Sequence, residues 1–498
     1  MSLENQRNLA LAIRHDPIFM RTASQVAAEM NKWAGDFFGR PIVDDWNEQL
    51  NFTTTMFRPR GLHLDDRHVR LASGDGFSAS IVDTTLFVVN NCERLLSAGS
   101  SLVLYLPKIQ TAEEAAAWND ILNALEEHLG LPNGTIKVYV LVEQLEASFQ
   151  LMEIRAVLGR HFVGFNTGRW DYINSVADAM AWAPEFVNPN IDTITMTYGY
   201  VRNYEDRVRR AANTPDQLGQ FALWQGGMEP NIPVGSEAGV AASMRRAVAG
   251  AEREQREGAS GKWVAHWKMV HIVRPVWERV GEANQMGRAF ARLTYTQADA
   301  DDLTYLEPSV RTIQGARDLL SVALRYGNAF GQGLQAAALK PADFFGGGDV
   351  LYLMEDMATG EIRLSILWEW LHKKAPLTAG DPRVGAEAGD QFTSDMFSRL
   401  LTEEYAKLLA TSDRDVHEDS KTTSLSIARA IVETYTLSNM KLPWYIDLLN
   451  INLGNYDLPE AQRRIRLLTE AFAKDGTRIT KVGETWLATT RFNGTRKL

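Results

Sequence analysis

Charged and polar side chains follow a series of short apolar segments, at the positions where active-site residues lie in parallel α/β proteins. The segments are near-continuously apolar, as in strands buried on both faces. The residues at or just after them are Arg60, Lys108, Glu143, Asp171, His266 and Asp356. Three carboxylates gathered at one point would repel each other, so a divalent cation or basic partners would have to hold them together.

The donor types favour magnesium over zinc. Two carboxylates with positions left for water and substrate suit Mg²⁺, whereas no group of Cys and His has zinc spacing. A carboxylate after a strand is more often a helix N-cap or a turn residue, so any one of these positions alone is weak evidence. The prediction depends on several of them converging at one end of a shared barrel.

The elements that must position these residues alternate between strand and helix. The predicted strands cover residues 52–57, 101–106, 137–142, 162–165, 221–224, 263–265 and 349–354. Helical patterns lie between them, such as 112–129, which ends at Gly130. This alternation predicts parallel βα units, and we expect an α/β fold, a TIM (β/α)8-type barrel with a C-terminal helical domain.

Three regions can be distinguished along the 498 residues. Residues 1–50 form an atypical N-terminal segment, and 51–375 a TIM-barrel catalytic domain with a helical insertion at about 268–345. Residues 376–498 form the C-terminal helical domain, in which the strand signal stops. Its predicted helices cover 394–409, 422–435 and 458–473.

Composition excludes several classes of function. The formal charge of −10 makes nucleic acid a poor partner. No apolar run approaches the roughly 20 residues that cross a bilayer, and the N-terminus lacks a signal-peptide pattern. The only cysteine, Cys92, fits a reducing compartment. We therefore expect a cytoplasmic protein without a membrane partner.

Six short motifs make the sequence resemble the malate synthase family. They run collinearly as Arg58-Pro-Arg-Gly-Leu-His-Leu64, Leu104-Tyr-Leu-Pro-Lys108, Val140-Leu-Val-Glu143, Asn166-Thr-Gly-Arg-Trp-Asp-Tyr172, Trp263-Val-Ala-His266 and Leu353-Met-Glu-Asp-Met-Ala-Thr359. The resemblance extends from near the N-terminus to about residue 450. It implies a Claisen condensation of acetyl-CoA with glyoxylate, followed by thioester hydrolysis to malate and CoA.

The resemblance also implies roles for individual residues. Glu143 and Asp171 correspond to the metal carboxylates for Mg²⁺. Arg60 corresponds to the arginine that faces the developing negative charge, and Asp356 to the general base that deprotonates the thioester methyl group.

The remaining implied roles concern the two substrates. The backbone around Gly168, Arg169 and Trp170 would hold the carboxylate of glyoxylate. Lys108 and Trp267 lie where the family binds the acyl-CoA.

The sequence also departs from the family. The N-terminal clasp and first barrel strand of the family are not found, so we expect residues 15–50, a homo-oligomer or another polypeptide to close the barrel. Leu62, Thr167 and Trp267 replace the family's Trp, Cys and Pro. Residues 227–231 replace an apolar run where the acyl-CoA is expected.

Three functions remain open from the sequence. The first is malate synthesis from acetyl-CoA and glyoxylate. The second is a related reaction that uses another acyl-CoA or oxo acid, or that acts on thioesters of the malyl-CoA type. The third is a structural or regulatory subunit that a partner chain completes, against which the retained Arg60, Glu143, Asp171 and Asp356 argue.

Overall fold

A curled parallel sheet forms the centre of the described structure. The computed structural model describes residues 28, 32, 54, 56–232, 237–266, 269–331, 336–339, 353–356, 358–410, 425–439 and 441. The predicted N-terminal segment 1–50 and the predicted helix 458–473 therefore lie almost wholly outside the described residues.

Six parallel strands build the sheet in the order β1-β4-β5-β6-β7-β8. They are β1 (Met56–Phe57), β4 (Leu102–Leu106), β5 (Ile136–Val142), β6 (Phe162–Thr167), β7 (Leu223–Glu229) and β8 (Gly261–Val264). Each overlaps one of the first six predicted strands. Sequence order equals spatial order along the sheet, as successive βα units require.

Alternation along the strands separates the two faces of the sheet. In β4, Leu104 and Leu106 pack into the large core under the helices, whereas Val103 and Tyr105 pack on the inner face. The ring of Tyr105 stacks on Trp263 of β8, with 4.8 Å between ring centroids. Four strand spacings in a flat sheet would separate them by roughly 19 Å. The sheet is therefore curled about its inner face.

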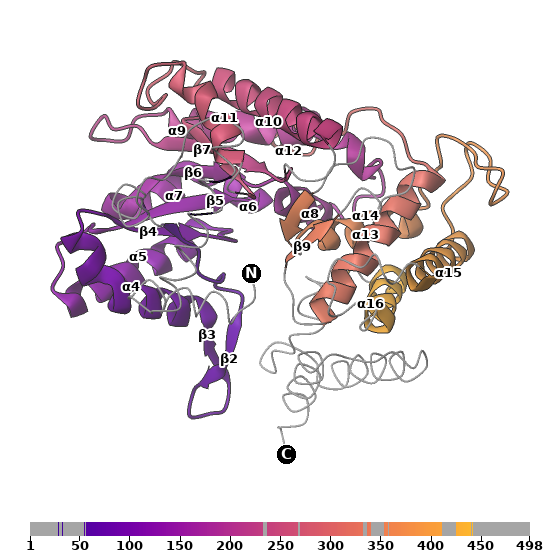
Figure 1. Cartoon of the computed structure of the whole chain (residues 1–498), viewed down its shortest axis with the longest axis horizontal. Helices are drawn as coiled ribbons and strands as arrows, with labels where there is room; N and C mark the ends of the chain where they lie inside the picture. The colour runs from indigo at the N-terminus through magenta and orange to yellow at the C-terminus, as the bar shows by residue number, and fades with distance from the viewer. Residues whose placement is uncertain are drawn as a thin grey trace.

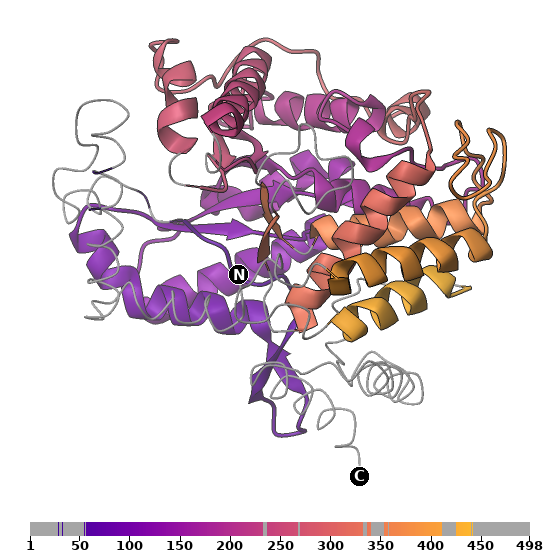
Figure 2. The same cartoon turned by 45° about the vertical axis from the view of Figure 1, so that its right-hand side comes forward.

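Helices cover the outer face of this sheet (Figures 1 and 2). Between the strands lie α4 (Ala79–Ser97), α5 (Ala112–Leu129), α6 (Leu145–Ser148), α7 (Leu151–Leu158), α8 (Trp170–Ala179), α9 (Gly199–Ala212) and α10 (Glu237–Glu257). The predicted helix 112–129 is confirmed with the same bounds. Thr111 and Glu114 form a capping box at its start, and Gly130 ends it at φ +66°.

One hairpin interrupts the rhythm of strands and helices. Strands β2 (Asp65–Arg70) and β3 (Gly76–Ser78) pair antiparallel and project from the body between β1 and α4 (Figure 1). Sequence analysis did not predict this hairpin. Its polar strand sequence, Asp-Asp-Arg-His-Val-Arg, carries no period-two apolar pattern.

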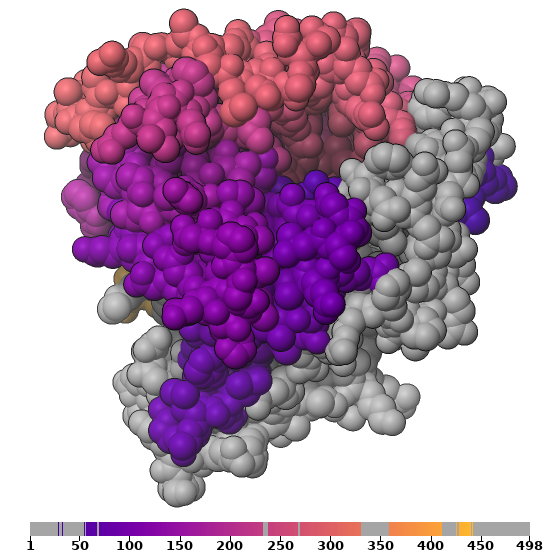
Figure 3. All heavy atoms as spheres, turned by 90° about the vertical axis from the view of Figure 1, so that its left-hand side faces the viewer, coloured from indigo at the N-terminus to yellow at the C-terminus, as the bar shows by residue number. Residues whose placement is uncertain are grey.

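The segment that follows β8 is helical only in part. It contains α11 (Val270–Glu278) and α12 (Gln297–Leu303), joined by residues 279–296, which form turns and irregular backbone. Figure 3 shows this salmon-coloured segment along the upper edge of the N-terminal half. Together with α13 (Ile313–Gly331), these elements occupy the predicted helical insertion at 268–345.

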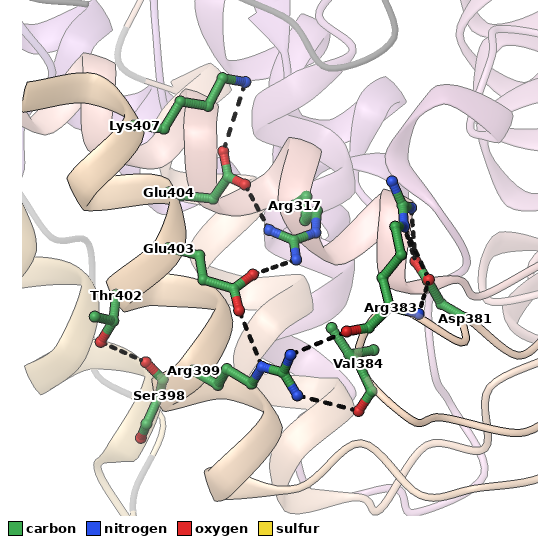
Figure 4. A network of polar contacts seen from close by, with 10 residues as sticks. All are labelled: Arg317, Asp381, Arg383, Val384, Ser398, Arg399, Thr402, Glu403, Glu404 and Lys407. Atoms are coloured by element: carbon green, nitrogen blue, oxygen red, sulfur yellow. Dashed lines mark hydrogen bonds and ion pairs between the residues drawn. The ribbon is translucent and has the colours of Figure 1, made fainter. Parts of the chain in front are cut away.

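Four helices pack together on the C-terminal side of the sheet. They are α13, α14 (Ala358–His372), α15 (Ser394–Ala410) and α16 (Leu425–Leu437). The last two confirm the predicted helices at 394–409 and 422–435. Figure 4 shows an ion network of Arg317, Arg399, Glu403, Glu404 and Lys407, which joins α13 to α15.

The last predicted strand needs correction. Residues 349–354 were expected to form a further parallel strand, but β10 (Leu353–Asp356) pairs antiparallel with β9 (Ala336–Leu339) in a separate two-stranded sheet. A short apolar run predicts a buried strand without specifying its direction or partner.

Over the described ranges, none of the helices is long and apolar enough to span a membrane.

Candidate active site

Charged side chains from three neighbouring strands meet at the carboxyl ends of the sheet. Arg58 directly follows β1, Lys108 lies two residues after β4, and Glu143 directly follows β5. Asp171 lies in the first turn of α8, just beyond β6. Because these strands are parallel and adjacent, their carboxyl ends share one edge, where active sites of parallel α/β folds lie. Of the six residues expected to converge at this end, the structure brings Lys108, Glu143 and Asp171 together.

Glu143 and Asp171 form a buried carboxylate pair. Glu143 is fully buried and Asp171 nearly so. The Lys108 Nζ lies 3.2 Å from Glu143 Oε2 and 2.5 Å from Asp171 Oδ1. The backbone N–H of Lys108 donates to Glu143 Oε1 at 2.9 Å. A lysine therefore contacts both acids at once.

The electrostatics of the carboxylate pair are unequal. Burial, followed by the charge of Glu143, raises the pKa of Asp171 to about 7. Burial also acts to raise the pKa of Glu143, but the charges of Lys108 and Arg58 outweigh it and hold that pKa below its usual value. Glu143 therefore carries the negative charge, and Asp171 holds a proton more readily than an ordinary aspartate.

The two arginines of the Arg-Pro-Arg motif have separate environments. Arg60 is buried, and its Nε and Nη2 donate to Asp83 at 2.7 Å, while Nη2 also donates to Asp66 at 2.7 Å. Arg58 instead places its Nη2 3.9 Å from Glu143 Oε1, with its side chain 37% exposed. The structure thus brings Arg58, which sequence reasoning passed over, toward the carboxylate pair. It engages Arg60 with two other carboxylates.

Aromatic and amide side chains line the inner face below the carboxylate pair. The guanidinium of Arg58 lies 5.3 Å from the ring centroid of Tyr105. The Tyr105 hydroxyl donates to Asn166 Oδ1, and Asn166 Nδ2 donates to the carbonyl of Gly226 at 2.8 Å. Trp263 Nε1 donates to Gln225 Oε1 at 2.9 Å. These bonds tie strands β4, β6, β7 and β8 into one rigid support.

The turn between β6 and α8 comes close to Glu143. A Cβ on Gly168 would lie 3.0 Å from Leu141 Cδ1 and 3.2 Å from Glu143 Cβ, so glycine allows this approach. The Gly168 N–H donates to the hydroxyl of Tyr204, which also donates to the carbonyl of Val142. Tyr204 therefore fixes the turn that leads to Asp171.

Helix α8 begins at the site. Trp170 is its first residue, Arg169 its N-cap, and Asp171 lies in its first turn. The first N–H groups of a helix have no intrahelical acceptor, so this end suits a small carboxylate. The Arg169 guanidinium stacks 3.8 Å from the Trp170 ring centroid. The position agrees with the expected substrate-binding backbone, whose role stays a prediction.

The other expected site residues are only partly described. The backbone of Asp356 ends β10, but its side chain lies outside the described residues. Trp267 also falls outside them. Lys108, which was expected near the acyl-CoA, points its ammonium into the carboxylate pair.

The carboxylate pair supplies oxygen donors of the kind that hold Mg²⁺ in proteins. Within the described part of the chain, no three His, Cys, Asp or Glu side chains gather in a metal-binding group. Mg²⁺ keeps several waters and is commonly held by one or two carboxylates and substrate oxygens. Two buried carboxylates at the end of a sheet supply that donor set.

Family comparisons match most of the described chain. The family description "Malate synthase, TIM barrel domain" matches residues 54–304, and "Malate synthase, C-terminal" matches residues 311–439. The first match covers the six-stranded sheet. The fold is thus the TIM-barrel type with a helical C-terminal domain.

Individual relatives agree with the family match. The chain is 32% identical to malate synthase of Myxococcus xanthus over 82% of this chain and 68% of that protein. It is 32% identical to malate synthase A of Escherichia coli over 70% of this chain and 60% of that protein. It is 38% identical to the bifunctional glyoxylate cycle protein of Caenorhabditis elegans over 65% of this chain, but only 32% of that protein. The chain belongs to the malate synthase family.

Proposed function

We propose that this protein condenses acetyl-CoA with glyoxylate and hydrolyses the product thioester to malate and CoA. The observation that carries the proposal is the buried carboxylate pair, Glu143 and Asp171, with Arg58 and Lys108 against it at the strand ends. The pair lies within residues 54–304, which the malate synthase TIM-barrel description matches. The same chemistry supports a place in the glyoxylate cycle, and the single buried cysteine supports a cytoplasmic location.

Glu143 and Asp171 would hold Mg²⁺ in this reaction. Bound there, Mg²⁺ supplies Lewis-acid polarisation of the glyoxylate aldehyde. The N–H groups at the start of α8 would receive the glyoxylate carboxylate beside the pair.

Asp356 is proposed as the base that removes a proton from the acetyl methyl group. The resulting carbon nucleophile bonds to the aldehyde carbon of glyoxylate, and the aldehyde oxygen takes up a proton. Water then cleaves the thioester and releases the thiol of CoA. An arginine must stabilise the enolate oxygen as it forms, because the methyl group is a very weak acid.

Arg58 suits the enolate role better than Arg60. The guanidinium of Arg58 faces Glu143 and lies over Tyr105, whereas Nε and Nη2 of Arg60 are hydrogen-bonded to Asp83 and Asp66. We therefore propose Arg58 for the role that the family resemblance suggested for Arg60.

The polar residues Glu229 and Asn231 are the reason for testing a second acyl-CoA beside acetyl-CoA. Glu229 and Asn231, which replace apolar residues of the family, are buried and hydrogen-bonded to each other, and Lys262 lies 3.8 Å from Glu229. Met228 beside them is 46% exposed. These polar replacements lie where the family resemblance expects the acyl-CoA, so the choice of acyl group is tested together with the reaction.

Thiol release tests the proposal directly. The chain is incubated with glyoxylate, Mg²⁺ and either acetyl-CoA or propionyl-CoA, beside an Asp356→Asn control. We expect release with acetyl-CoA and its loss in the control. Thiol release with propionyl-CoA but not with acetyl-CoA would mean that acetyl-CoA is not the substrate. A chain that releases thiol from neither would refute the proposed condensation.

A further inference from the structure

Lys108 is held by the carboxylate pair through both its backbone and its side chain. Its N–H donates to Glu143 Oε1 at 2.9 Å, and its ammonium contacts Glu143 Oε2 at 3.2 Å and Asp171 Oδ1 at 2.5 Å. The Lys108 side chain is only 13% exposed. The ammonium therefore points inward to the two acids.

The backbone of Lys108 supports the same conclusion. Its φ of +58° is one of two positive values among non-glycine residues in the described part of the chain. The left-handed region costs a residue with a Cβ on the order of 1–2 kcal/mol. A lysine kept in that conformation indicates that its position at the pair is specified by its surroundings.

Two cations compete for the same oxygens. The two oxygens that the ammonium contacts, Glu143 Oε2 and Asp171 Oδ1, come one from each acid of the proposed magnesium site. A metal ion bound through these two oxygens would lie about 2.0–2.1 Å from each, which leaves no room for the ammonium between them. Metal binding through these oxygens would therefore displace the Lys108 ammonium.

We propose that Lys108 is an internal competitor of the divalent cation, which lowers metal affinity and couples metal binding to glyoxylate binding. Once moved from the pair, the ammonium needs another negative partner in a buried site. The glyoxylate carboxylate supplies that charge. Metal and glyoxylate should therefore bind more tightly together than separately. This inference rests on the proposed function, because it takes Glu143 and Asp171 as the metal ligands.

Metal affinity without acyl-CoA tests the inference on the full chain. Mn²⁺ binding is measured by calorimetry and by electron paramagnetic resonance, with and without glyoxylate. We expect Lys108→Met to bind Mn²⁺ about tenfold more tightly than the wild type, because the opposing charge is gone. We also expect glyoxylate to strengthen Mn²⁺ binding less in this variant than in the wild type.

Matched variants separate competition from structural damage. Lys108→Gly removes the ammonium while accepting the φ of +58°, and it should tighten Mn²⁺ binding in the same way. Lys137→Met is the control, because Lys137 Nζ donates to the Arg160 carbonyl at the opposite end of β5, and it should bind Mn²⁺ as the wild type does. Asp171→Asn should abolish binding and so identify the site.

The outcomes distinguish this inference from the proposed function. Unchanged or weaker Mn²⁺ binding in both folded Lys108 variants would overturn the competition while leaving the condensation intact. Absence of Mn²⁺ binding in the wild type and in both variants would overturn the inference and the proposed metal site together. A wild type without thiol release but with tighter Mn²⁺ binding in the variants would refute the condensation alone.

Discussion

Two groups of charges in this protein differ in arrangement more than in number: the carboxylate pair is buried, whereas the C-terminal ion network is partly exposed. In the C-terminal ion network, Arg317 Nη1 donates to Glu404 at 2.9 Å, and Arg399 Nε donates to Glu403 at 2.9 Å (Figure 4). Hydrogen bonds from Arg317 and then Arg399 lower the pKa of Glu403. In the carboxylate pair, Glu143 and Asp171 face each other, and the pKa of Asp171 rises to about 7.

The contrast separates a structural arrangement from a site prepared for a ligand. The guanidinium groups in the C-terminal network donate directed hydrogen bonds to Glu403 and Glu404, although burial still raises the pKa of Glu404. At the end of the sheet, two acids share a single ammonium. Their mutual repulsion is therefore only partly offset, and a divalent cation would offset it further. Perturbed pairs of this kind concentrate at functional sites.

The largest effect on activity is expected from a substitution in the carboxylate pair. Asp171→Asn should lower kcat for thiol release by about a thousandfold or more, because a metal ligand is lost from the reacting centre. The free energy of unfolding, measured with a chelator present to remove metal ions, should change little, because asparagine resembles the protonated aspartate. The matched control is Glu403→Gln in the ion network, which should keep kcat within about twofold. Equal losses in both variants would remove the distinction between the two groups.

The next effect concerns stability and the two motif arginines. Arg60→Gln should lower the free energy of unfolding by about 3–5 kcal/mol, because Asp66 and Asp83 would be left buried without their cation. Arg58→Gln should instead lower kcat about a hundredfold with less than about 1 kcal/mol of destabilisation. Urea denaturation and thiol release on both variants measure the two quantities. The reversed pattern would return the enolate role to Arg60.

An intermediate effect is expected from Glu369, a buried carboxyl held by amide donors. Asn188 N–H and Nδ2 donate to its Oε2 at 3.0 Å. Burial raises its pKa from 4.5 to about 7, which corresponds to roughly 3 kcal/mol. Below pH 4.5 Glu369 is protonated in both the folded and unfolded states. Stability should therefore be lost as pH rises from 4.5 through 7.

Glu369→Gln isolates this contribution. The variant should flatten the stability profile between pH 5 and 8 and exceed the wild type at the upper end, as measured by urea midpoints at each pH. An unchanged slope would assign the pH dependence to other groups, such as Glu254, whose pKa burial also raises to about 7.

The smallest effect lies at the rim of the ion network. The Arg399 side chain is 51% exposed and pairs with Glu403 one helical turn away. Arg399→Ala should cost about 0.2–1 kcal/mol of stability and leave kcat unchanged. A loss of several kcal/mol in thermal unfolding would show that the network depends on its exposed members.

Strand periodicity predicted the position of the site but not its internal geometry. Apolar runs fixed β4, β5 and β6 closely, and parallel pairing then requires that Lys108, Glu143 and Asp171 converge. The direction in which each side chain points within the site depends on the loops that follow the strands. Arg58 and Arg60 lie beyond the end of β1, where alternation no longer decides which way a side chain points.

Tertiary partners account for the remaining differences. Arg60 turns toward Asp83 of α4, a residue that no local pattern connects to the motif. The positive φ of Lys108 likewise follows from contacts with a later strand and helix. The antiparallel pairing of β9 and β10 depends on a partner that a single apolar run does not specify.

The stacking of Tyr105 on Trp263 provides a way to follow the assembly of the sheet during folding. The two residues lie 158 positions apart in the sequence, and their rings meet only when β4 and β8 have both joined the curled sheet. Contacts so distant in sequence form late, because the intervening loop must close first. The part of the tryptophan fluorescence that is lost in Trp263→Phe should therefore change after helical circular dichroism is regained in refolding experiments, and Tyr105→Leu should alter that late signal.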